Sequence, residues 1–301
     1  MVWFLTALIA AVFSSVGNII DSHLLTKKMP NLSSFLIPMG FAQLIGGIIL
    51  LVFFPFPNNP SLEHLLIGCC SGLLNASGYL IILNTLRKSE VSRVIPVISS
   101  APIFVALLSI PLLGEMLGFW QWFAILITVA GGVLISLQID AGGRKARLQK
   151  SFFILLLVAL MLAVASIGFK YALEKVSFWD MYGINGICIA SVVLIYSLRK
   201  SNLLEWRSLK QRTQKILIFV VDVCLGITAG ILGFKALEIG PVALVNAILN
   251  VRPAFVFVFS LILSAFFPNV INDRLNRRTA LLKFTAVALM TAGIVIISLF
   301  S

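Results

Sequence analysis

An arginine followed by a proline interrupts the apolar segment AILNVRPAFVFVFS at residues 247–260. The guanidinium of Arg252 is a permanent cation with five N–H donors in a planar fork, a geometry that suits carboxylate and phosphate groups. A carboxylate, Asp222, lies within the preceding apolar segment. Two interpretations follow: Arg252 and Asp222 form a structural ion pair, or Arg252 binds the anionic part of a small molecule. Asp222 is also the candidate residue for proton coupling.

Neutral amide side chains lie in the same kind of apolar segment and are able to hydrogen-bond a small molecule. Asn246 and Asn250 are one helical turn apart, but Arg252 is about 200° round the helix from Asn250, so they need not line one surface. Each amide is alternatively explained by a hydrogen bond between neighbouring helices. The candidate binding residues are Arg252, Asn250, Asn246, Asn84, Asn18 and Gln43.

Enzyme chemistry has little support in the sequence. The two histidines, His23 and His64, are far apart, and neither a His-Glu-x-x-His motif nor a Gly-Lys-Ser/Thr phosphate loop is present. The four cysteines lie in apolar segments without metal-ligating neighbours, so we expect free thiols. We predict that the protein is not an enzyme and holds neither a metal nor a cofactor. An intramembrane enzyme is the least favoured alternative.

The composition identifies the solvent in which these residues must fold. Of the 301 residues, 60% are hydrophobic and 11% are charged, too little polarity to cover a water-soluble protein. A bilayer core about 30 Å thick requires about 20 apolar residues per helix, and period-two strand alternation is absent. We predict an all-α integral membrane protein with ten transmembrane helices. They span about residues 2–25, 33–54, 63–86, 91–113, 118–138, 152–173, 178–198, 216–237, 241–265 and 280–300.

Lysine and arginine residues gather in the odd-numbered loops between the predicted helices. By the positive-inside rule these loops are cytoplasmic and both termini are external. The formal net charge of +12 then reflects membrane orientation, and no nucleic-acid partner is expected.

In this topology, placing the charged side chain of Arg252 inside the membrane costs free energy. If the ninth helix begins near Pro241, Arg252 lies about 16 Å inside, close to the midpoint, where a charge costs at least about 2.5–3.5 kcal/mol. It therefore needs an anion, carbonyl groups or water as a partner. Asp222 lies about 10 Å from the cytoplasmic side, a difference that an arginine side chain bridges if the two helices adjoin.

The two halves of the sequence repeat each other. A shift of 151 positions, as from Ser15 to Ser166, aligns PIFVALLSIPL at 102–112 with PAFVFVFSLIL at 253–263. Each half holds five predicted helices, an odd number, so the second half must enter the membrane in the opposite orientation. Such inverted repeats allow a carrier to open alternately to either side of the membrane.

The repeat defines the domain organisation. We predict a first five-helix repeat at residues 1–138, a cytoplasmic linker at 139–151 and a second repeat at 152–301. Pro102 and Pro253 align under the shift, and each removes a backbone donor, so we expect both to kink their helices.

The segment EVSRVIPVISSAPIFVALLSIPLLGEMLGFWQWFAILITVAGGVLIS at residues 90–136 resembles EamA-type domains of the drug/metabolite transporter superfamily in its small residues, prolines, Gly-Glu and Gly-Gly. The resemblance covers two such domains, about 5–138 and 152–300. The second departs from the pattern, because Phe266 stands where the first has Glu115.

The resemblance implies a carrier with a central cavity between its halves, usually an exporter. We therefore expect a secondary transporter that exports a small metabolite, amino acid-like or amphiphilic compound by alternating access. A non-transporting membrane scaffold or sensor is the main alternative. The expected partners are a small-molecule substrate and the lipid bilayer, and the expected state is a monomer or homodimer in a bacterial inner membrane.

Overall fold

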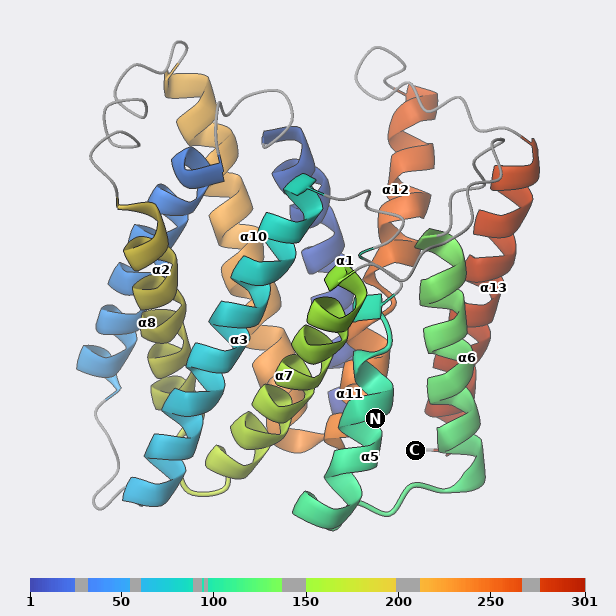
Figure 1. Cartoon of the computed structure of the whole chain (residues 1–301), viewed down its shortest axis with the longest axis horizontal. Coiled ribbons are helices and arrows are strands. Elements are labelled where there is room, and N and C mark those ends of the chain that lie inside the picture. The colour runs from blue at the N-terminus through green and yellow to red at the C-terminus, as the bar shows by residue number, and fades with distance from the viewer. Residues whose placement is uncertain are drawn as a thin grey trace.

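The computed structural model describes residues 1–24, 32–54, 61–88, 94, 97–136, 150–198, 212–266 and 277–300. These residues form helices joined by short connections, with no strand among them (Figure 1). The helices are α1 (Val2–His23), α2 (Leu32–Phe53), α3 (Leu62–Lys88), α5 (Ala101–Leu113), α6 (Phe119–Ser136), α7 (Lys150–Ala172), α8 (Phe178–Ser197), α10 (Arg212–Ile239), α11 (Val242–Leu249), α12 (Arg252–Phe266) and α13 (Arg277–Phe300). The predicted linker at 139–151 lies outside the described residues except for 150–151, which begin α7.

Eight segments of the described chain are helical, long and apolar enough to cross a membrane. One of them, Val242–Ser264, combines α11 with most of α12, and two shorter apolar helices occupy Ala101–Leu113 and Phe119–Ile135. The shorter helices fall within the predicted spans at 91–113 and 118–138, parts of which lie outside the described residues. The chain is an integral membrane protein made of helices.

The two ends of the bundle differ. Both chain termini lie toward the end that also carries the connections from α5 to α6, from α7 to α8 and from α10 to α11 (Figure 1). We call this end the terminal face. The helices α1, α3, α6, α8 and α12 end on the opposite side, which we call the basic-loop face because the predicted basic loops follow these helices.

Long helices pack against one another in pairs: α2 with α8, α6 with α13, α1 with α10 and α3 with α7. Glycines allow the closest approaches. A Cβ atom at Gly47 of α2 would lie 2.7 Å from the carbonyl oxygen of Gly183 on α8. One at Gly131 of α6 would lie 2.6 Å from Cγ of Met290 on α13. Small residues therefore let the helix backbones meet, as is common between membrane helices.

Both segments that carry the paired prolines are interrupted. Residues 250–251 form a turn between α11 and α12, and residues 99–100 form a turn before α5. Pro253 and Pro102 stand in the first turn of the helix that follows, where the missing N–H costs no helical hydrogen bond. Where kinks were expected, each segment is therefore interrupted by a two-residue turn just before its proline.

Candidate functional site

The two helix breaks meet inside the bundle. Asn250 Nδ2 donates a hydrogen bond to the carbonyl oxygen of Ser99, its counterpart under the repeat, at 2.9 Å. On α1, Ser15 Oγ lies 2.6 Å from the carbonyl oxygen of Ala11 and 3.1 Å from that of Arg252. These side-chain contacts join α1 and the two broken segments. We call the region formed by Ser15, Ser99, Asn250 and Arg252 the helix-break site.

Among the described residues, the guanidinium of Arg252 has no ion-pair partner. The ion pair found there joins Lys235 and Glu238 instead. Its Nε atom is buried and makes no hydrogen bond to a described residue. A buried charge without a partner is strongly unfavourable, both inside proteins and inside a bilayer. The Nε donor of Arg252 is therefore available for an anionic group or for water.

Asp222 contacts a second carboxyl group instead of Arg252. It is 9% exposed and lies within hydrogen-bond distance of Asp21 across the interface of α1 and α10. Asp21 lies about 9 Å beyond Ser15 toward the basic-loop face. Arg252 begins α12, and a side chain at that position points toward the terminal face. In this conformation the two carboxyl groups pair with each other and Arg252 pairs with neither. A hydrogen bond between two carboxyl groups requires a proton on one of them.

The interface of α3 and α7 is the repeat counterpart of this crossing. Gly17 and Asp222 correspond to Gly168 and Ser71 under the shift of 151 positions. A Cβ atom added at Gly17 would lie 3.7 Å from Asp222 Oδ1. One added at Gly168 would lie 2.0 Å from Ser71 Oγ. The counterpart of the other carboxyl group is Ala172. Because the second crossing packs with a serine and an alanine, helix packing alone does not demand two carboxyl groups at the first.

Asn246 and Asn18 lie near the helix-break site. Asn246 Oδ1 accepts a hydrogen bond from Ser166 of α7 at 3.2 Å, and its Nδ2 donates to the carbonyl oxygen of Val242 at 2.9 Å. Asn18 is exposed on α1, one helical turn beyond Ser15. Ser166 and Ser15 are repeat counterparts, and both contact the interrupted ninth segment.

Asn84 and Gln43 lie at other interfaces. Asn84 accepts a hydrogen bond from the hydroxyl of Tyr196 on α8 at 2.7 Å and donates to the carbonyl oxygen of Leu80 at 3.0 Å. The side-chain oxygen of Gln43 would lie 3.4 Å from a Cβ atom at Gly186, where α2 packs on α8. These contacts place both amides between packed helices and separate them from the helix-break site.

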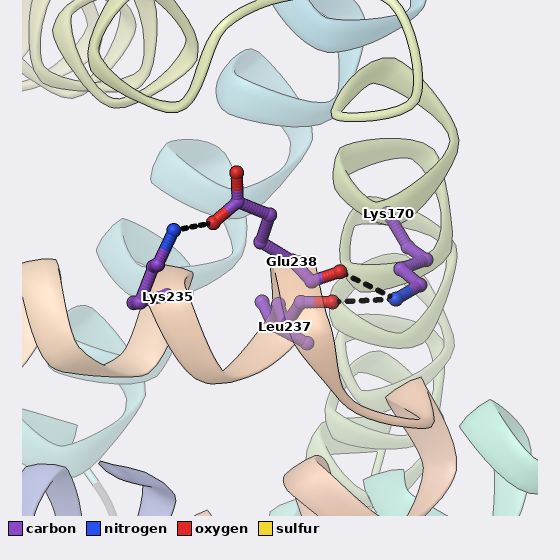
Figure 2. Close-up of polar contacts among 4 residues, drawn as sticks. All are labelled: Lys170, Lys235, Leu237 and Glu238. Carbon is purple, nitrogen blue, oxygen red and sulfur yellow. Dashed lines mark hydrogen bonds and ion pairs between the residues drawn. The ribbon is translucent and has the colours of Figure 1, made fainter. Parts of the chain in front are cut away.

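At the terminal face, two charged side chains hold the connection between α10 and α11. Lys170, near the end of α7, donates from Nζ to three backbone carbonyl oxygens at the end of α10 and the residue after it, each at 2.9 Å. Figure 2 shows two of these bonds, to Leu237 and Glu238. The acceptors are Leu237, Glu238 and Gly240. Glu115, between α5 and α6, accepts from the first two N–H groups of α11 at 2.6 and 3.4 Å. Each charge complements the dipole of the helix end that it binds.

A cavity of about 360 Å³ lies beside these contacts, lined in part by Glu115, Lys170 and Gln121. The nearby ion pair of Lys235 and Glu238 differs in character, because its side chains are 47% and 27% exposed (Figure 2). The sequence analysis did not predict the contacts of Glu115 and Lys170. Both residues bind backbone groups, which every residue has, so no particular residue type in the sequence indicates the partner.

Residues 1–137 match the model of the EamA-like transporter family. The matched residues cover the first of the two predicted repeats. A solved structure described as "Crystal structure of protein" aligns over 99% of this chain and 95% of its own, with a TM-score of 0.66 and 16% sequence identity. At that identity the alignment shows a shared fold. No curated protein matches the chain. The described residues include no group of three or more His, Cys, Asp or Glu side chains placed to hold a metal ion.

Proposed function

We propose that this protein is a secondary transporter that exports a small metabolite, amino acid-like or amphiphilic, with an anionic group. Its ten helices form two inverted repeats, residues 1–138 and 152–301, and its termini lie outside a bacterial inner membrane. The family match over the first half and the corresponding interfaces of α1 with α10 and α3 with α7 support this architecture. Inverted repeats expose one central site alternately to each side.

The observation that carries the proposal is the guanidinium of Arg252 beside a helix break, without an ion-pair partner among the described residues and with a buried Nε that donates to none of them. In carriers with interrupted membrane helices, substrate sites lie near the bilayer midplane at such breaks. A carboxylate or phosphate matches the planar donors of arginine and supplies the missing countercharge. Asn18 and Asn246, each about one helical turn from a residue of the helix-break site, are the proposed neutral contacts. Asn250 holds the break itself through Ser99.

We further propose that a proton drives export through Asp222, with Asp21 as its partner. Two carboxyl groups that share one proton change their net charge when a second proton binds or the first leaves. Asp222 is mostly buried, and the pair lies about 9 Å along α1 from the contact of Ser15 with the ninth segment. A change of charge at this pair is therefore close enough to favour one conformation of the helix-break site over another.

Flux measurements in proteoliposomes test the proposed function. Purified protein is first screened by thermal shift against carboxylates, amino acids and phosphate esters, and the stabilising compounds are then used in counterflow assays. Arg252→Lys keeps the charge but loses the planar fork, so KM should rise about tenfold, the effect of losing one charge-assisted hydrogen bond. Lys235→Arg, the reverse exchange at an exposed ion pair, is the matched control and should leave KM unchanged.

Two results would contradict the proposal in different ways. Absence of flux and counterflow for every compound that stabilises the protein would refute transport. Saturable flux with the same KM in Arg252→Lys and in the parent would refute the role of Arg252 in binding. If Arg252→Lys instead fails to fold and Asp222→Asn restores folding, the two charges form an ion pair in another conformation.

A further inference from the structure

The contacts of Glu115 join the two halves of the chain at the terminal face. Glu115 belongs to residues 1–138, whereas the N–H groups that it accepts from begin α11 in residues 152–301. Lys170 binds the end of α10 on the other side of the same connection. Because α10 leads into α11 through Gly240 and Pro241, the two charges hold both ends of one short link. We call Glu115 and Lys170 the terminal clasp.

Toward the membrane interior, the helix that the clasp holds enters a buried apolar cluster. Residues 242–245 of α11 are 0% exposed, as are Ala247 and Ile248. They pack with side chains of α1, α5, α6, α7, α10 and α13. Among these neighbours are Ala7, Val105, Ile125 and Ile297. A polar compound cannot pass through such a cluster without displacing α11, so this route to the terminal face is closed in this conformation.

The repeat shows that the clasp is not part of the shared architecture. Under the shift of 151 positions, Glu115 corresponds to Phe266 and Lys170 to Ile19. Neither counterpart carries a charge, so the two positions that the repeat relates to the clasp hold no pair of charges to bind helix ends. A contact that a five-helix repeat needed in order to fold would be expected in both halves. The clasp therefore distinguishes the terminal face from the basic-loop face.

We propose that the terminal clasp is the gate of the terminal face. Opening requires Glu115 to release the first N–H groups of α11 and Lys170 to release the carbonyl groups at the end of α10, after which α11 is free to move. A charged group bound to a helix end through several hydrogen bonds is a strong but reversible contact. The inference rests on the proposed transport function, because a gate matters only if a compound passes.

The accessibility of a buried thiol measures opening without any transported compound. In the full chain with its four native cysteines replaced, Ala7→Cys places a thiol in the apolar cluster at a position that is 0% exposed. A hydrophilic maleimide should label it slowly in detergent. Glu115→Gln keeps the side-chain size but removes the charge, and should raise the labelling rate about tenfold, as expected for one lost charge-assisted hydrogen bond. Lys170→Gln should raise it similarly.

Glu238→Gln is the matched control. The same chemical change there removes a carboxylate from the exposed pair with Lys235, beside the clasp (Figure 2), and labelling should stay at the parent rate. Glu115→Asp retains the charge and should label more slowly than Glu115→Gln. Melting temperatures identify any variant that fails to fold, and if Glu115→Gln is one, Lys170→Gln decides.

The gate is refuted if folded Glu115→Gln and Lys170→Gln label no faster than Glu238→Gln. Faster labelling in a protein for which no compound shows flux would support the clasp while refuting transport. Flux together with unchanged labelling would support transport and refute the clasp as a gate. The two proposals therefore fail separately.

Discussion

Replacing Gly47 by alanine tests how closely the two halves must approach where α2 packs on α8. A Cβ atom there would lie 2.7 Å from the carbonyl oxygen of Gly183 and 2.8 Å from Cγ1 of Ile187. The isoleucine side chain is able to rotate, but the carbonyl oxygen moves only if α8 moves. Overpacking of this kind costs about 1–3 kcal/mol, and the better helix propensity of alanine returns at most about 1 kcal/mol. We expect the free energy of unfolding to fall by about 1–2 kcal/mol.

Gly46→Ala is the matched control, because nothing lies within 4 Å of a Cβ atom at that neighbouring position. Thermal unfolding of parent and variants in one detergent measures the difference. At about 2–4 °C per kcal/mol, Gly47→Ala should melt a few degrees below the parent, and Gly46→Ala at or above it. Equal melting temperatures for the two variants would refute the close backbone approach of α2 and α8.

Two further predictions concern polar groups within the bundle. Asp222→Asn removes one titratable group from the pair with Asp21, so flux should lose its dependence on the pH gradient while exchange at equal pH continues; gradient-driven flux in the variant would contradict coupling at this pair. Ser177→Ala removes the cap of α8, where the hydroxyl accepts from the N–H of Asp180 at 3.3 Å, and should lower the free energy of unfolding by about 1 kcal/mol, measured by denaturation against Ser191→Ala as control.

The helical architecture was largely predictable because a membrane imposes strong rules on the sequence. Apolar length located the helices, and the repeat located both breaks, since Pro102 and Pro253 must each begin a helix or disrupt one. The predicted linker at 139–151 and the basic loops lie outside the described residues apart from 150–151, so membrane orientation stays a prediction.

The neighbours of the charged residues were not predictable, because hydropathy gives the depth of a residue but not the direction it faces. Depth alone made Asp222 a plausible partner for Arg252, whereas the structure pairs it with Asp21 on an adjoining helix. The internal repeat contained information that the membrane depth of each residue did not. Gly17 packs opposite Asp222 in the same way as Gly168 packs opposite Ser71. Such paired glycines could have identified the crossing of α1 with α10.

The repeat also separates shared architecture from proposed function. Arg252 aligns with Ala101, Asp222 with Ser71 and Glu115 with Phe266, so each charge has an uncharged counterpart. A carrier with two equivalent half-sites would carry these charges in both halves. Among the described residues, the proposed transporter has one such guanidinium for its cargo, one such carboxyl pair, and the clasp at the terminal face. The expected stoichiometry is therefore one anionic group per transport cycle, and the two faces should open at unequal free-energy cost.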